Sequence, residues 1–318
     1  MITYRDVGMT YGDKTILKNI NLTIEDGELF VLVGPSGSGK TTLLRMLNQL
    51  TVPTAGDVYL DDRKIKTYDV RQLRLHMGYV LQDSCLFPNL TVADNVTIQL
   101  EQQGVGKQQR RERAAELLTE VDLDPDQYAD RYPHELSGGQ QQRVALIRAL
   151  ATAPKLVLMD ESFSALDPVL RQKAQELVLK LHQTYRPTVV FVTHDMQEAL
   201  RMGHRIAVLH QGELQQVGTP SEILRHPAND FIRQFFGSRQ PHWWQLAYLV
   251  QSGLLDQVTV TDQLPVLTQF SDLITRLQTV PQLAFQYQGQ GYSVTREQLL
   301  TYLGQEGSGT DARTLAND

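Results

Sequence analysis

Residues Gly34 to Thr41 read GPSGSGKT and fit the pattern G-x-x-x-x-G-K-[ST]. An apolar run, LFVLV, precedes them, and a helix-forming run, LLRMLNQL, follows. Glycines let successive backbone N–H groups curl around phosphate oxygens, and the start of the helix adds partial positive charge. In such a loop Lys40 would neutralise the β- and γ-phosphates and the Thr41 hydroxyl would ligate Mg²⁺. The predicted phosphate-binding residues are Gly34, Pro35, Ser36, Gly37, Ser38, Gly39, Lys40, Thr41 and Thr42.

An acidic pair, Asp160 and Glu161, follows a second apolar run, LVLM. Acidic residues after strands are common, so this pair alone fits a solvated loop equally well. Together with a phosphate loop, Asp160 is expected to hold Mg²⁺, and Glu161 to orient or deprotonate a water in line with the γ-phosphate.

His194 follows a third apolar run, VVFV. A lone histidine is more often structural than catalytic. Its predicted place beside the acidic pair favours a contact with the γ-phosphate, where it would help to hold the attacking water.

Three short apolar runs must position these residues: Leu29 to Val33, Leu156 to Met159 and Val189 to Val192. Each is aliphatic or β-branched without alternation, which is typical of strands covered on both faces of a parallel sheet. Ligands of open α/β sheets gather beyond the carboxyl ends of the strands. The sequence therefore predicts an α/β fold with its polar residues at one sheet edge.

Helices and turns account for much of the remaining chain. Lys107 to Val121 has strong helix formers and an apolar stripe at Ala114, Leu117, Leu118 and Val121. Gln142 to Ala151 also reads as helix, so residues of about 86–150 are predicted to form a helical insert. The N-terminal segment, with turn signals at YGDKT and EDGE, predicts a small antiparallel β layer. Residues 237–303 predict a small second domain, and 304–318 a disordered tail.

The composition excludes several classes of protein. The 318 residues are 41% hydrophobic and 21% charged, with a net charge of −6, which argues against a nucleic-acid-binding protein. A single cysteine, Cys85, excludes a disulfide scaffold. No apolar stretch approaches the roughly 18 residues of a membrane span. If the protein acts at a membrane, it is expected to dock onto a partner that spans it.

The segment ELSGGQQQR, Glu135 to Arg143, contains a glycine pair that a helix interior would disfavour. With this segment, the chain resembles the ATP-binding-cassette ATPases over roughly residues 1–236. That family's signature, LSGGQ, is complete at Leu136 to Gln140. The resemblance implies a P-loop NTPase fold of the ABC type, with a RecA-like core, an antiparallel β layer and a helical subdomain.

The same resemblance assigns further roles. It implies that Tyr11 stacks on adenine and that Gln82 contacts Mg²⁺ and senses a membrane partner. It matches His194 to the family's switch histidine and Ser164 to Asp167 to the loop between two subunits. One departure is Ser162, which stands where many importer-type members have proline.

The resemblance also explains the glycine pair. At a helix start, N–H groups and the helix dipole can bind an anion. In the family, the signature of one chain covers the ATP held by the phosphate loop of another, in a head-to-tail dimer. The resemblance therefore implies that a second copy of this chain is the partner. It also implies nucleotide contacts from Ser137, Gly138, Gly139, Gln140 and Asp167.

The detailed resemblance is to importers of glycine betaine, carnitine and choline. It rests on LHMGYVLQDSCLFPNLTVADNV and RYPHELSGGQQQRVALIRAL. It implies an ATPase on the cytoplasmic face of the membrane, with permease subunits docked near Phe87, Pro88 and Leu90, and indirectly an extracytoplasmic solute-binding protein. Import of methionine or polar amino acids is an alternative, and a soluble regulatory ATPase is a more distant one.

The segments VTVTDQLPVLTQFSDLITRL and GYSVTREQLLTYL resemble a cystathionine-β-synthase-type (CBS) regulatory module. Such modules usually occur in tandem, whereas residues 237–303 have room for about one. In osmoprotectant cassettes the module senses ionic strength or cyclic di-AMP, which the resemblance implies as a ligand here.

Overall fold

The computed structural model describes residues 1–82, 85–164, 166–237, 246–261, 264–268 and 270–306. The chain divides into two compact units, residues 1–233 and 234–318. The predicted domain boundary at 236–237 lies within helix α10 (Asp230–Gly237), a few residues beyond this division.

A four-stranded sheet forms the N-terminal layer, in the order β2-β1-β4-β5. All of its pairings are antiparallel, as the turn signals predicted. Its inward side chains, which include Tyr4 and Ile20, are buried in one core with helix α1 and the central sheet. Its strands are β1 (Ile2–Tyr11), β2 (Lys14–Ile24), β4 (Ala55–Leu60) and β5 (Arg63–Lys64).

The central sheet has six strands in the order β10-β9-β3-β8-β7-β6. All neighbours are parallel except β10 and β9. The three predicted strands are adjacent, and every residue of β3, β7 and β8 is buried. The strands are β3 (Leu29–Val33), β6 (Met77–Val80), β7 (Leu156–Asp160), β8 (Thr188–Thr193), β9 (Arg205–His210) and β10 (Glu213–Gly218).

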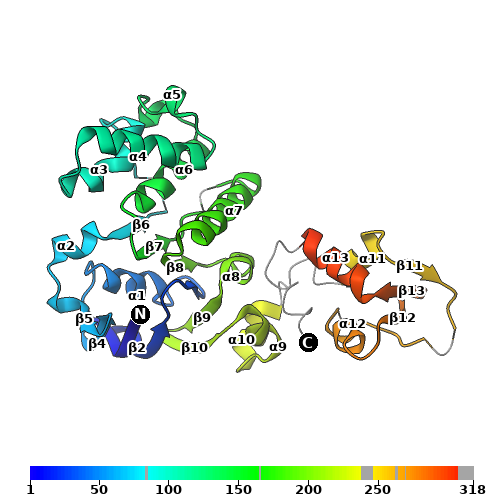
Figure 1. Cartoon of the computed structure of the whole chain (residues 1–318). Helices are drawn as coiled ribbons and strands as arrows, with labels where there is room; N and C mark the ends of the chain where they lie inside the picture. Colours follow the sequence, from blue (N-terminus) through cyan, green and yellow to red (C-terminus); the bar gives the residue numbers. More distant parts are fainter. Residues whose placement is uncertain (83–84, 165, 238–245, 262–263, 269, 307–318) are drawn as a thin grey trace. The chain divides into compact units, whose positions relative to one another are not determined.

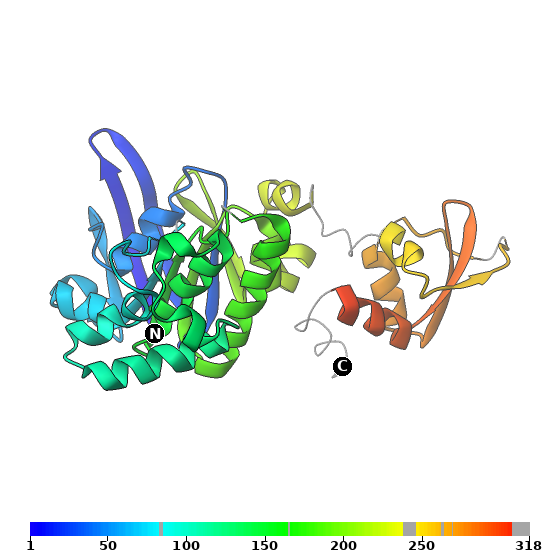
Figure 2. The same cartoon turned by 90° about the horizontal axis from the view of Figure 1, so that it is seen from above.

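The predicted helical insert is present as a layer of helices, drawn in teal and green in Figure 1. The stripe predicted at Ala114, Leu117, Leu118 and Val121 is buried in its core. Figure 2 shows α3 and α4 lying away from the long β1–β2 hairpin. The layer comprises α3 (Val92–Gln102), α4 (Lys107–Glu120), α5 (Pro125–Tyr128), the 3₁₀ turn η2 (Pro133–Glu135) and α6 (Gly138–Leu150).

The remaining helices of the first unit flank the strands. The short ones are η1 (Ile65–Thr67), α2 (Val70–Leu75), α8 (Met196–Met202) and α9 (Pro220–Arg225). The longer ones are α1 (Lys40–Leu47) and α7 (Pro168–Tyr185). Among the described residues, none of the helices has the length and apolar character that a membrane crossing requires.

The second unit has a three-stranded antiparallel sheet in the order β11-β13-β12. Its own apolar core includes Phe270, Phe285 and Tyr302. Residues 304–306, predicted as the start of a disordered tail, instead end helix α13, and 307–318 lie outside the described residues. Its elements are α11 (Leu246–Gln251), β11 (Asp256–Val258), α12 (Phe270–Leu277), β12 (Gln282–Tyr287), β13 (Gln290–Thr295) and α13 (Arg296–Glu306).

Candidate active site

Strand register brings the predicted polar residues to one edge of the central sheet. Val33 of β3 pairs with Thr193 of β8, and Val192 pairs with Asp160 of β7. Three adjacent strands therefore end at nearly the same height in the sheet, and they are followed by the loop from Gly34, the acidic pair and His194. This is the carboxyl edge, where open α/β sheets bind ligands.

The phosphate loop requires glycine at two of its positions. Gly34 has φ 155°, and a Cβ there would lie 2.1 Å from the Leu209 carbonyl oxygen. Gly39 has φ 100°, and its Cβ would lie 2.5 Å from a Leu17 methyl group on β2. The loop is therefore held between β9 and the antiparallel layer. Ser36 and Gly37 are exposed, and Pro35 is half-buried.

One buried hydroxyl in the loop suggests a ligand. Ser38 is buried, and its Oγ has no hydrogen-bond partner among the described residues. Buried polar atoms without partners are rare in native proteins. A phosphate oxygen in the loop would accept this hydrogen bond, so the residues present fit a phosphate group.

Lys40, the first residue of α1, is buried. Its Nζ donates to the carbonyl oxygens of Gly34, at 2.8 Å, and Pro35, at 3.0 Å. Burial lowers the pKa of this ammonium group, an effect that the nearby carboxylates of Glu161 and Asp160 oppose. The ammonium thus lies inside the loop with both carboxylates close by.

Thr41 and Asp160 join the loop to strand β7. The Thr41 hydroxyl donates to Asp160 Oδ1 at 2.8 Å. Arg45 Nη2 lies 3.5 Å from Asp160 Oδ2. The sequence prediction missed Arg45, although its spacing of four residues from Thr41 places both on one face of α1. Thr42 is half-buried in the first turn of α1.

Glu161 and His194 lie together, as Glu161 Oε2 and His194 Nδ1 are 3.1 Å apart. Glu161 has φ 47°, an uncommon left-handed conformation for a residue with a side chain. Its N–H donates to the Val192 carbonyl at 3.0 Å, which ties the turn to β8. The His194 side chain is 53% exposed and that of Glu161 26%, so both are open to solvent at this edge.

The signature residues begin helix α6 in the helical layer. Ser137 is the N-cap and forms a capping box with Gln140: Gln140 N donates to Ser137 Oγ, and Ser137 N to Gln140 Oε1. A Cβ on Gly138 would meet nothing within 4 Å. A Cβ on Gly139 would lie 3.3 Å from the methyl groups of Leu170.

Three other predicted residues lie outside the cluster that the contacts define. Asp167 caps α7, where its Oδ1 accepts hydrogen bonds from Val169 N at 3.0 Å and Leu170 N at 3.1 Å. Tyr11, 55% exposed, ends β1 beside the hairpin turn. Gln82 is exposed two residues after β6, whose neighbour in the sheet is β7.

The arrangement is suited to an anion with a bound cation. The described residues include no group of three or more His, Cys, Asp or Glu side chains that could hold a metal ion. Mg²⁺ commonly takes one or two protein oxygens, with waters and substrate phosphates as its other ligands. Thr41 Oγ1 and Asp160 Oδ1, beside the phosphate loop, fit that pattern.

Comparisons with known proteins agree with this geometry. The sequence model of the ABC transporter family matches residues 17–164. The choline transport ATP-binding protein OpuBA of Bacillus subtilis is 48% identical over 241 residues, 76% of this chain and 63% of that protein. The glycine betaine/proline betaine transport system ATP-binding protein ProV of Salmonella typhimurium is 48% identical over 224 residues, 69% of this chain and 56% of that protein. The chain thus matches less than two thirds of the length of these relatives.

A solved structure is matched over nearly its whole length. It is the dimeric structure of a post-hydrolysis state of the ATP-binding cassette MJ0796 bound to ADP and Pi. This chain superposes on it with a TM-score of 0.62 and 39% sequence identity, over 69% of this chain and 99% of that one.

Proposed function

The chain belongs to the ABC transporter family, and we propose that it is the ATP-hydrolysing subunit of an importer for osmoprotectants such as glycine betaine, carnitine and choline. The observation that carries the proposal is the convergence of Lys40, Asp160, Glu161 and His194 at the carboxyl edge of β3, β7 and β8. The choline and glycine betaine transport relatives support the class of solute.

The phosphate loop would bind the β- and γ-phosphates of ATP. Lys40 would exchange its loop carbonyl partners for phosphate oxygens, and Ser38 Oγ would gain the partner that it lacks among the described residues. Exposed Tyr11 would stack on adenine. Thr41, Asp160 and Gln82 would hold Mg²⁺, which neutralises charge on the phosphates when bound.

Glu161 is the proposed general base. A water oxygen attacks the γ-phosphorus, the bond from that phosphorus to the bridging oxygen breaks, and the water's proton passes to Glu161, leaving ADP and phosphate. His194, 3.1 Å from Glu161, would hold the water and the γ-phosphate in place. Ser162 leaves this pair intact despite the departure from proline.

The second half of the site would come from another copy of the chain. The phosphate loop of one chain would bind the anion from one side, and the open surface at Gly138 of the other chain would approach the same anion from the opposite side. Ser137, Gly139, Gln140 and Asp167 would complete that contact. One loop and one signature in each chain favour a symmetric head-to-tail dimer that closes on ATP and opens after hydrolysis.

A cavity of about 480 Å³ is the proposed docking site for a permease subunit. Its lining residues come from four places: Tyr79 in β6, the loop at Cys85 and Phe87, helix α3 at Ile98, and α6 at Arg148. Arg148 Nη1 donates to the Cys85 carbonyl at 2.8 Å, which ties the loop to α6. Phe87 is 46% exposed, as an apolar anchor for a partner would be. This arrangement would hold the chain on the cytoplasmic face of the membrane, with a solute-binding protein on the other side.

The second unit is proposed as a divergent CBS-like regulatory domain. A sheet of β11, β12 and β13 with helices around a separate apolar core supports a domain that folds on its own. We propose that it responds to ionic strength or to cyclic di-AMP.

The test is uptake by vesicles that contain the complete transporter. Labelled glycine betaine, carnitine and choline should accumulate with ATP, whereas methionine and polar amino acids should not. A Lys40→Ala variant provides the control without hydrolysis. Uptake of methionine alone would favour the amino-acid importer, and ATPase activity stimulated by ribosomes or DNA, with no permease bound, would favour a soluble regulatory ATPase.

A further inference from the structure

A buried hydrogen bond connects helix α6 to the turn that carries Glu161. Gln142 Nε2 donates to the Ser162 carbonyl oxygen at 2.6 Å. Gln142 is 4% exposed and Ser162 1%, so the bond is shielded from water. Loss of the donor would leave a buried carbonyl without this partner, which proteins strongly avoid.

Glu161 also holds the turn through its own backbone, because its N–H donates to the Val192 carbonyl at 3.0 Å and its carbonyl oxygen accepts from Ser164 N at 3.1 Å and Ser164 Oγ at 2.9 Å. On its sheet side, Phe163 is buried and packs edge-on against Phe191 of β8, with ring centroids 5.3 Å apart. The Ser162 hydroxyl is buried and has no hydrogen-bond partner among the described residues. The left-handed φ of Glu161 carries a strain that the surroundings must sustain. Gln142 therefore holds the peptide adjacent to this strained residue.

The same helix carries the signature. Gln142 lies five residues after Ser137, about 7.5 Å along the helix axis at the usual rise per residue. Both residues belong to one continuous hydrogen-bonded segment. A shift of the start of α6 would therefore reach the Ser162 peptide through Gln142.

We propose that Gln142 is a positioning residue, which couples the signature helix to Glu161 through the Ser162 carbonyl. The inference rests on the proposed hydrolysis at Glu161. Gln142 itself is buried and would act only through the turn that carries Glu161. It keeps the Glu161 carboxylate aligned with His194 when the signature of this chain contacts a partner's nucleotide.

The experiment compares Gln142→Met with Gln49→Met in the full chain. Gln49 is the matched control because its Nε2 also donates to a backbone carbonyl, that of Ile65 at 2.7 Å, away from the site. Gln142→Met is expected to lower kcat by about 10- to 100-fold, with KM for ATP unchanged within about twofold, because a small misalignment is costly in rate. Gln49→Met is expected to keep the wild-type kcat.

A double-mutant cycle tests whether Gln142 acts through Glu161. In a Glu161→Gln background, Gln142→Met should change the residual rate by less than about twofold. The same fold-loss in both backgrounds would overturn the proposal, as would a raised KM with an unchanged kcat.

Hydrogen exchange separates this inference from the proposed function. Gln142→Met should speed amide exchange in the segment 161–164 relative to Gln49→Met, whether or not the protein hydrolyses ATP. Unchanged exchange there would refute the coupling. A wild-type chain without ATPase activity, alone and in its transporter, would instead refute the proposed function.

Discussion

The glycine-containing helix starts at the phosphate loop and at the signature are built in opposite ways. At the phosphate loop, Gly34 and Gly39 adopt positive φ, and any Cβ would strike Leu209 or Leu17. At the signature, Gly138 is exposed, and a Cβ there would meet no atom within 4 Å. The first glycines are required by the chain's own packing, but Gly138 is not.

This difference indicates what each glycine is for. The first loop is shaped by contacts with β2 and β9, so it is complete within one chain. Packing inside the chain does not require glycine at 138, which agrees with the proposed approach of a second chain to the start of α6. Variants at each start should therefore differ in both the sign and the kind of their effects.

The largest effect is expected on the side of the phosphate loop. Glu161→Gln should lower the ATPase rate by about 10²- to 10⁴-fold, because it removes the proposed general base. It should also trap an ATP-bound dimer, which light scattering would detect. Glu176→Gln is the matched control, since Glu176 lies on the surface of α7 and forms an ion pair with Arg201 of α8. An unchanged rate in Glu161→Gln would reject Glu161 as the base.

The next effect is on folding. Gly34→Ala places a Cβ against the Leu209 carbonyl, in a conformation that side chains rarely adopt. Such strain costs about 1–3 kcal/mol, and the clash adds to it. Chemical denaturation should therefore show a free energy of unfolding lower by at least about 2 kcal/mol. If Gly34→Ala were as stable as the wild type, the loop would accommodate a side chain, and packing would not require glycine there.

A smaller effect of opposite sign is expected at the signature. Gly138→Ala replaces glycine in the first turn of a helix where the Cβ has free space, which should raise the free energy of unfolding by about 0.5 kcal/mol. The same variant should lose the ATP-dependent dimer in the Glu161→Gln background. If the double variant formed the dimer at the same ATP concentration as Glu161→Gln alone, Gly138 would not face a partner.

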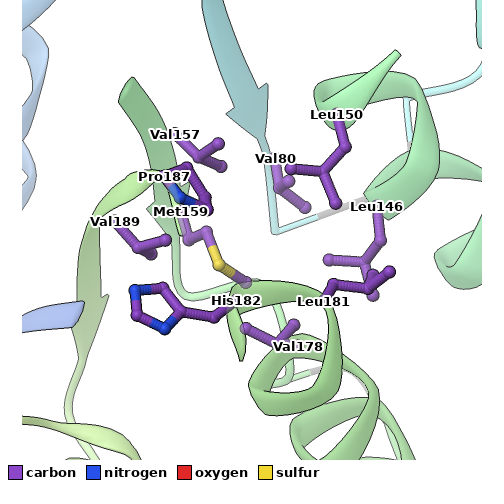
Figure 3. A pocket seen from close by; sticks show the side chains of 10 residues that line it. All are labelled: Val80, Leu146, Leu150, Val157, Met159, Val178, Leu181, His182, Pro187 and Val189. Carbon is purple, nitrogen blue, oxygen red and sulfur yellow. The ribbon is translucent and has the colours of Figure 1, made fainter. Parts of the chain in front are cut away.

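The smallest effect concerns His182, near the end of α7, whose backbone partners Gly27 and Pro187 precede strands β3 and β8. Figure 3 shows it beside a cavity of about 20 Å³ that α6 and α7 line against β6 and β7. Burial lowers the pKa of His182, aided by His204 and Arg186, although backbone hydrogen bonds at Gly27 and Pro187 oppose the shift. The folded protein therefore binds this proton less readily than the unfolded chain does.

The sign of the pH effect follows from that pKa. The stabilisation is full above about pH 6.5, the usual pKa, and is lost as the pH falls through the lower folded value. His182→Gln should therefore flatten the fall of the thermal midpoint between pH 7 and 5. His226→Gln, at an exposed position, is the control and should leave that slope unchanged.

The sequence predicted the parts of the site that depend on local pattern. The apolar runs became β3, β7 and β8, because burial on both faces requires continuous apolar side chains. The site roles of the predicted residues remain proposals, although the structure brings Lys40, Thr41, Asp160, Glu161 and His194 together.

Contacts between distant segments were not predictable in this way. The bonds of Arg45 with Asp160 and of Gln142 with Ser162 join residues 115 and 20 positions apart, and no local periodicity encodes them. Asp167 also shows this limit: the nucleotide contact that the resemblance implies stays a prediction, and the cap that its carboxylate forms on α7 was not predicted. Residue type alone does not show whether a side chain caps a helix of its own chain or binds a ligand.

The contact between Gly139 and Leu170 has a consequence for how such sequences diverge. Leucine methyl groups already lie at the limit of what a methyl on residue 139 would tolerate. Alanine at 139 is then accommodated without a shift of this side chain only where residue 170 is smaller, such as valine or alanine. Across descendants of this chain, alanine at 139 is expected to occur more often beside a smaller residue at 170 than beside leucine.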